Sequence, residues 1–188
     1  MKNHQSKGLS PTLWRTCRIL SGATRLSLFR RIIEIPGQCV STLAQAERIS
    51  RPRASQELRR LQSRGLVRVE RLWRYVRYYP ESDPLVSSAE PLLQAMRATF
   101  RQIPPERDGE IAKTAMGLSH GKRIAIVRIV REGPIDSHGL AAQLRIHVET
   151  VRHHLNFLED GGWVQRAGKI WALRASDLPL AKCLMKLL

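Results

Sequence analysis

A dense set of arginine and polar side chains occupies the segment from Arg51 to Arg77. The apolar residues Ala54, Leu58 and Leu61 recur at helical spacing, which leaves the arginines of residues 51–60 on the opposite face of one helix. Guanidinium groups bind phosphate and pair with guanine, and a glutamine amide pairs with adenine. These residue types at this spacing therefore predict a helix whose polar face can bind nucleic acid.

We expect contacts to base edges from Arg53, Gln56 and Arg59, because residues near the N-terminus of a recognition helix reach the bases. The other arginines of this helix and of the segment after it are expected to contact phosphates. Any one of them alone is adequately explained as a solvated surface charge, but their gathering on adjoining positions favours a binding surface. The full expected DNA-binding set here is Arg51, Arg53, Ser55, Gln56, Arg59, Arg60, Arg68, Arg71, Arg74 and Arg77.

The elements that must position this helix are short and well marked. Leu43 and Ala44 open a preceding helix, and residues 48–50 form a turn. Pro52 is tolerated in the first helical turn because the amide that it lacks would have no partner there. Gly65 ends the basic helix, and residues 66–79 read as an extended hairpin. Helix, turn, basic helix and hairpin together predict a winged helix-turn-helix.

The charge of the whole chain points in the same direction. Its 188 residues include 32 Lys and Arg against 16 Asp and Glu, a net charge of +16 that favours a polyanionic partner. No apolar run approaches the roughly 18 residues of a membrane helix, and the N-terminus lacks the apolar core of a signal peptide. Cys17, Cys39 and Cys183 are too few and too widely spaced for a disulfide framework. We expect a cytoplasmic, nucleoid-associated protein with no membrane partner.

The sequence repeats itself at an offset of 97 to 98 residues. The one-residue difference in offset falls in a loop between two helices, where length changes are tolerated. The repeat predicts two tandem winged helix-turn-helix domains, a mostly α fold with small β-hairpin wings (α+β). The matching pairs are Leu20 with Leu118, Arg25 with Arg123, Leu43 with Leu140, Leu58 with Leu155, Leu61 with Leu158 and Gly65 with Gly162.

We therefore expect a disordered basic tail at residues 1–9, a first domain with a C-terminal helix at 10–104, and a second such domain at 105–188. Residues 104–109 are the expected linker, because paired prolines followed by charges cannot continue a helix. The helix near 85–103 has an apolar stripe that packs on its own domain or forms a dimer seam. The final helix covers the second domain or joins an interface.

At these positions the sequence resembles the ArsR family of bacterial winged-helix transcriptional regulators. Leu20-Ser21-x-x-Thr24-Arg25-Leu26 is similar to the family signature that enters its second helix, and residues 150–164 of the second unit are similar too. The resemblance covers most of residues 11–173 and implies a DNA-binding transcriptional regulator, for which we favour repression over activation. Family members usually contain one such domain and form dimers, whereas this chain contains two.

Metal sensing does not transfer with the resemblance. Metal-sensing members have a Cys-x-Cys pair just before the Leu-Ala, and here those positions are Cys39 and Ser41. One thiolate cannot make a soft-metal site alone. The neighbouring His153 and His154 point about 100° apart on a helix and suit a shared ion poorly. We expect no metal or cofactor and, because no catalytic motif occurs, no enzymatic activity.

The second unit is less basic than the first. Residues 1–104 contain 19 basic and 7 acidic side chains, and residues 105–188 contain 13 and 9, which gives net charges of +12 and +4. Glu149 in the second recognition helix would repel phosphate, although it could accept a hydrogen bond from cytosine. We expect the first domain to dominate affinity and the second to read a weaker half-site or serve in assembly. The second expected DNA-binding set is Thr150, Arg152, His153, Asn156, Arg166 and Lys169.

Three interpretations remain. The leading one is a regulator of double-stranded DNA that acts as a single-chain pseudo-dimer or as a homodimer, with no effector identified. A plasmid- or phage-type replication or partition protein could use the same fold on DNA. A protein-interaction module could use winged helices as scaffolds. RNA is the weaker nucleic-acid partner, because base stacking by the hairpin tyrosines Tyr75, Tyr78 and Tyr79 is less favoured than core packing.

Overall fold

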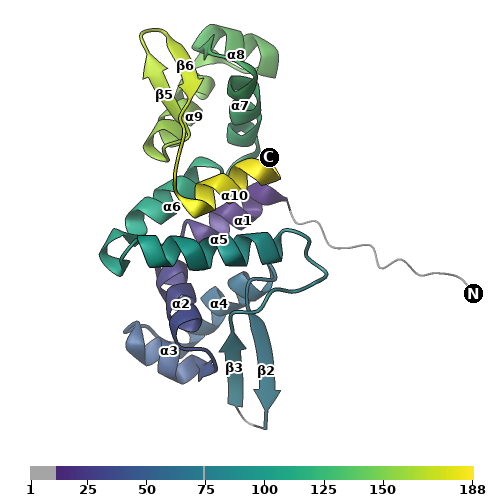
Figure 1. Ribbon diagram of the computed structural model, residues 1–188, viewed down its shortest axis with the longest axis vertical. Helices are drawn as coiled ribbons and strands as arrows, with labels where there is room; N and C mark the ends of the chain where they lie inside the picture. The colour runs from purple at the N-terminus through teal and green to yellow at the C-terminus, as the bar shows by residue number, and fades with distance from the viewer. Residues whose placement is uncertain (1–11, 74) are drawn as a thin grey trace, which may run out of the picture.

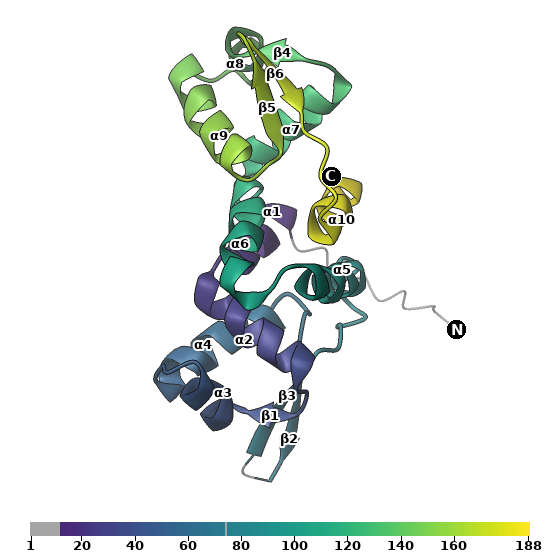
Figure 2. The same cartoon turned by 60° about the vertical axis from the view of Figure 1, so that its left-hand side comes forward.

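The computed structural model describes residues 12–73 and 75–188. The expected tail at residues 1–9 and the expected phosphate contact Arg74 lie outside the described residues. The chain is mostly helical, and a central group of helices separates two lobes that each end in a β-hairpin (Figures 1 and 2). None of the described helices is long and apolar enough to cross a membrane.

Both lobes contain the same elements in the same order. In each lobe a two-residue strand pairs antiparallel with the second strand of the hairpin, giving the sheet orders β1-β3-β2 and β4-β6-β5. These two short strands were not expected, because two residues show no periodicity in a sequence. The elements of the first lobe are α1 (Leu13–Leu20), α2 (Ala23–Glu34), β1 (Gln38–Cys39), α3 (Val40–Ala46), α4 (Arg51–Gln62), β2 (Arg68–Leu72), β3 (Tyr75–Tyr79) and α5 (Ala89–Gln102). Those of the second are α6 (Asp108–Gly117), α7 (Gly121–Glu132), β4 (Ile135–Asp136), α8 (Ser137–Leu144), α9 (Val148–Asp160), β5 (Val164–Ala167), β6 (Ile170–Leu173) and α10 (Pro179–Leu187).

Local chemistry explains how the two recognition helices, α4 and α9, begin. The Ser50 hydroxyl accepts a hydrogen bond of 3.4 Å from the backbone amide of Arg53, and the His147 ring accepts one of 3.3 Å from that of Glu149. Both contacts satisfy an amide that would otherwise lack a partner at a helix start. The turns before the helices also match, because Arg48 and Arg145 are both left-handed, with φ of 52° and 51°.

The central group of helices joins the two lobes by pairing equivalent helices. Helix α1 packs against α6, and α5 packs against α10. The backbone amide of Leu180 in α10 donates a hydrogen bond of 3.0 Å to the hydroxyl of Thr99 in α5, and both residues are buried. The apolar side of α5 is therefore shared between the lobes: Phe100 meets Phe29 of α2 edge to face at 6.0 Å, and α5 packs along α10 of the second lobe.

The connection between the lobes is short and held in place. A 3₁₀ turn (Pro105–Arg107) leads directly from the end of α5 into α6, where a linker was expected at residues 104–109. Arg30 of α2 is buried and donates to the carbonyls of Phe100 and Ile103 at 3.0 and 2.7 Å. The same guanidinium forms an ion pair with Asp108 at the start of α6, with one N–O distance of 3.2 Å. One arginine thus fixes the end of α5 and the start of α6 against α2.

Candidate nucleic-acid interface

Helix α4 divides cleanly into a buried and an exposed face. Ala54, Leu58 and Leu61 are fully buried against the first lobe, as their spacing predicts. Ser55 is half-buried, so its hydroxyl is less available than those of the fully exposed positions. The exposed members of the expected set on this helix are Arg51, Arg53, Gln56, Arg59 and Arg60.

An arginine of the wing (β2 and β3) and an arginine of helix α4 both act on the pKa of Tyr78. Tyr78 is buried at the base of β3, and burial raises its pKa, while the nearby guanidiniums of Arg59 and Arg71 oppose that rise. Arg59 belongs to α4 and Arg71 to β2, so both elements place a positive charge near the same hydroxyl. The packing of Tyr78 into the core agrees with the prediction for the hairpin tyrosines, whereas Tyr75 is half exposed.

Carboxylates already engage some of the expected arginines. Glu57, within α4, pairs with Arg25 of α2 at 2.5 Å and with Arg60 at 2.8 Å. Arg68, at the base of the wing, pairs with Glu81 at 2.5 Å, and this contact raises the pKa of Arg68 and lowers that of Glu81. A phosphate must compete with these carboxylates for Arg60 and Arg68. Among the described arginines of the expected set in this lobe, those that are exposed and form no ion pair are Arg51, Arg53, Arg59, Arg71 and Arg77.

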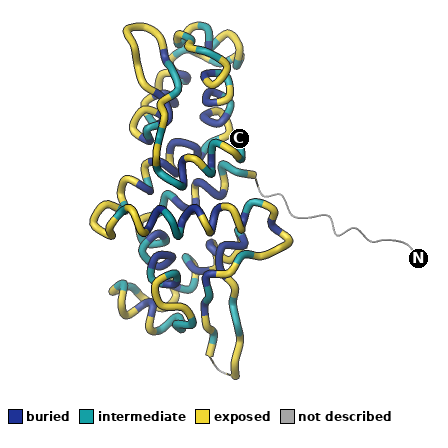
Figure 3. The backbone as a smooth tube through the Cα atoms, in the orientation of Figure 1, coloured by how far each residue is buried: buried dark blue, intermediate teal, exposed yellow. Residues whose placement is uncertain are grey.

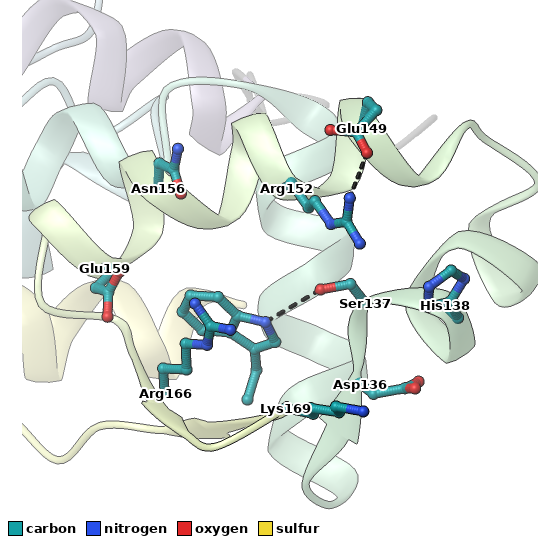
Figure 4. Close-up of a pocket in the computed structure, with 10 residues that line it drawn as sticks. Asp136, Ser137, His138, Glu149, Arg152, Asn156, Glu159, Arg166 and Lys169 are labelled. Atoms are coloured by element: carbon teal, nitrogen blue, oxygen red, sulfur yellow. Dashed lines mark hydrogen bonds and ion pairs between the residues drawn. The ribbon is translucent and has the colours of Figure 1, made fainter.

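In the second lobe a cleft of about 750 Å³ lies between α9 and the hairpin of β5 and β6. Four residues of the expected set line it: Arg152 and Asn156 from α9, and Arg166 and Lys169 from the hairpin (Figure 4). The other two members of the expected set are not among the residues that line the cleft: Thr150 is half-buried, and His153 is exposed elsewhere on α9. The structure thus brings recognition helix and wing together around one groove.

Carboxylates balance the cations of this cleft. Asp136, Glu149 and Glu159 line it together with three cationic side chains, and Glu149 is paired with Arg152 (Figure 4). Sequence reasoning had noted Glu149 but not Asp136 or Glu159. Asp136 enters the cleft through the short strand β4, which no periodic pattern announces. These carboxylates reduce the net positive charge of the cleft.

The two interfaces lie on the same side of the molecule. In Figure 2 helices α4 and α9 both lie along the left edge, whereas α5 and α10 both lie to the right. The equivalent helices α1 and α6 lie between the two recognition helices.

A difference between the lobes appears behind the recognition helices. In the first lobe the half-buried Arg25 is neutralised by Glu57, whereas the corresponding residues of the second lobe are Arg123 and His154. His154 is buried and its ring stacks on His120 with ring centroids 4.9 Å apart. Burial, assisted by the nearby charges of His120, Arg123, His153 and Lys122, lowers the pKa of His154 from 6.5 to about 4. His154 is therefore held neutral in the folded chain at neutral pH.

This burial makes the folded chain sensitive to acid. The folded pKa of His154 lies below the ordinary value, so its contribution is present above about pH 6.5 and is lost as pH falls towards 4. Between about pH 7.5 and about pH 5 we expect a loss of roughly 2 kcal/mol in the free energy of unfolding from this residue alone. Urea unfolding at both pH values should show that loss reduced in His154→Gln. The exposed His138→Gln serves as the control, and an equal pH dependence in both variants would contradict the assignment.

The described residues contain no group of three His, Cys, Asp or Glu side chains placed to hold a metal ion. Cys39 instead hydrogen-bonds the hydroxyls of Ser41 and Thr42 at 2.9 and 3.2 Å, and these contacts lower its thiol pKa to about 6. Metal-sensing regulators have a second cysteine two residues after the first. In this chain that position is Ser41, whose hydroxyl contacts the Cys39 sulfur. The local hydrogen bonds explain the residue types present without any bound ion.

Comparison with known proteins bears on the second lobe. Residues 120–166 match the bacterial regulatory protein, arsR family. The match runs from the residue before α7 into β5 and includes α8 and α9, so it supports one ArsR-like winged-helix domain there. Such a domain suggests a DNA-binding transcription regulator. A comparison with curated proteins finds no match.

Proposed function

We propose that the chain is a transcriptional regulator that binds double-stranded DNA as a single-chain pseudo-dimer of two winged-helix domains. The observation that supports this most directly is the pairing of equivalent helices, α1 with α6 and α5 with α10. A two-fold dimer interface brings the same surface of two subunits together. The meeting of equivalent helices within one chain would be the intramolecular counterpart of such an interface, and α4 and α9 lie along the same edge of the molecule in Figure 2.

The two halves are proposed to contribute unequally to binding. The exposed arginines of α4 and the first wing lie in a part of the chain with a net charge of +12, whereas the cleft of the second lobe contains three carboxylates. Phosphate contacts supply most of the affinity for DNA, so the first lobe would anchor the complex. The second lobe would read a weaker half-site through Arg152 and Asn156, or serve in assembly.

Footprinting on genomic DNA, combined with the mass of the complex in solution, tests this proposal. We expect one chain per duplex, two unlike half-sites about one helical turn apart, and an affinity that falls steeply with salt. Footprints at promoters, with higher transcription when the protein is removed, would support repression. Footprints at a replication origin would favour the replication or partition alternative. Two chains on a symmetric site would replace the pseudo-dimer with a homodimer, and no binding at low salt would overturn the proposal.

A further inference from the structure

The tip of the first wing exposes a large aromatic side chain. Trp73 directly follows β2 and is fully exposed, at 102%, and the paired residues beside it, Leu72 and Tyr75, are 47% and 50% exposed. Of the other three tryptophans, Trp163 and Trp171 are buried in the second lobe and Trp14 is partly buried in α1. Water-exposed apolar surface concentrated at one place marks a binding surface in soluble proteins.

The backbone of the turn does not call for tryptophan. Trp73 has a left-handed conformation with φ of 56°, and Gly168 holds the equivalent place in the second wing with φ of 64°. Glycine is the residue that this conformation favours, whereas a bulky side chain is strained in it. Trp73 is therefore unfavourable in two ways: its backbone is strained, and its apolar ring is exposed to water. Such an outlier points to a function for the side chain.

The charges around Trp73 indicate what it meets. Arg71, two residues before it, and Arg77, on the partner strand, are exposed and form no ion pair among the described residues. The charges of Arg71 in the wing and of Arg59 in the recognition helix both act on the pKa of Tyr78, which is buried at the base of β3. An apolar tip flanked by cations next to a recognition helix complements the minor groove of DNA, whose walls are phosphates and whose floor is stacked bases.

We propose that Trp73 acts as a wedge that enters the minor groove beside the segment read by α4 and partly unstacks one base step. Apolar side chains inserted in this way kink a duplex, and aromatic rings stack on bases of any sequence. The inference rests on the proposed function. It adds that the DNA is deformed only where the first wing binds, because the second wing has Gly168 at the equivalent position. The step that deforms most easily is pyrimidine–purine, so the wedge favours such a step at one flank of the site.

Trp73→Gly is the decisive variant, because glycine relieves the left-handed strain and leaves the turn as the second wing builds it. The full chain and the variant are titrated with a duplex that the full chain selects from a random pool. We expect the variant to bind about tenfold more weakly with an unchanged salt dependence, since no charge is lost. Arg71→Ala is the matched control and should reduce the salt dependence. 2-Aminopurine placed at successive steps should brighten at one flank with the full chain and not with Trp73→Gly.

The outcomes separate the wedge from the proposed function. Equal affinity and equal 2-aminopurine signals for the full chain and Trp73→Gly would overturn the wedge while leaving DNA binding in place. Failure of the full chain to select or bind any duplex at low salt would overturn both. Vesicles of phosphatidylglycerol and phosphatidylcholine form a second arm. Binding to them that exceeds duplex binding and disappears in Trp73→Gly would assign the side chain to a lipid surface and overturn the wedge.

Discussion

Replacing both Arg53 and Arg59 with alanine is expected to lower the affinity of the full chain for its duplex by about a hundredfold or more. Each arginine bidentate to guanine contributes roughly 1–3 kcal/mol, and about 1.4 kcal/mol corresponds to a factor of ten. Both side chains are exposed on α4, and the only described contact of Arg53 outside its helix is a hydrogen bond of 3.3 Å to the Thr24 hydroxyl. The substitutions should therefore leave the fold intact, which circular dichroism can check. Fluorescence anisotropy with labelled duplex measures the loss.

The matched control is the corresponding change in the second lobe. Arg152→Ala with Asn156→Ala removes two expected base contacts from α9, where Arg152 is already paired with Glu149. We expect less than about a tenfold loss for this pair, because Arg152 is already engaged by the Glu149 carboxylate and Asn156 carries no charge. Comparable losses from the two pairs of substitutions would contradict the proposed dominance of the first lobe.

Asp108→Ala is expected to have the largest effect on stability, a loss of about 3 kcal/mol or more in the free energy of unfolding. Its partner Arg30 is 6% exposed in its side chain, so removal of the carboxylate leaves a buried charge whose remaining counterion is the exposed Glu34 carboxylate, at 4.0 Å. The remaining hydrogen bonds to the carbonyls of Phe100 and Ile103 do not neutralise that charge. Urea denaturation followed by circular dichroism measures the loss.

A second ion pair provides the comparison. Asp177 and Lys182 form a salt bridge of 2.8 Å, but both side chains are exposed, and Asp177→Ala should destabilise the protein far less than Asp108→Ala. The double variant Arg30→Met with Asp108→Leu should be less harmful than Asp108→Ala, because it removes both buried charges together. If Asp108→Ala were no more damaging than Asp177→Ala, the Arg30 contact would not hold the two lobes as described.

The positions of the recognition helices followed from local signals in the sequence. Ala54, Leu58 and Leu61 predicted which face of α4 is buried, and Gly65 marked the end of the segment, where it is left-handed with φ of 67°. The same offset that aligned Leu43 with Leu140 also placed the second helix-turn-helix. These features depend on neighbours within a few residues or on repetition of a pattern, and both are visible in a linear sequence.

Features that depend on contacts between distant residues could not be predicted in this way. Nothing in the local pattern shows that Glu57 neutralises Arg25, or that Asp136 reaches the cleft beside α9 through a two-residue strand. The exposure of Trp73 also needed the structure, because a tryptophan in a hairpin with alternating aromatic residues equally fits a core position. Each of these depends on which segments meet in space.

The sequence by itself predicted two pairs of helices joined by a turn, each followed by a hairpin, and which face of α4 and of α9 is exposed and polar. Hydrophobic spacing and turn residues act over one or two helical turns, so they are sufficient for that conclusion. Only the tertiary structure decided how the two units are joined, with α1 on α6 and α5 on α10. The apolar stripes of those helices fit an intermolecular seam as well as an intramolecular one. The buried contacts of Arg30 and Thr99 with the second unit, made within one chain, select the intramolecular arrangement.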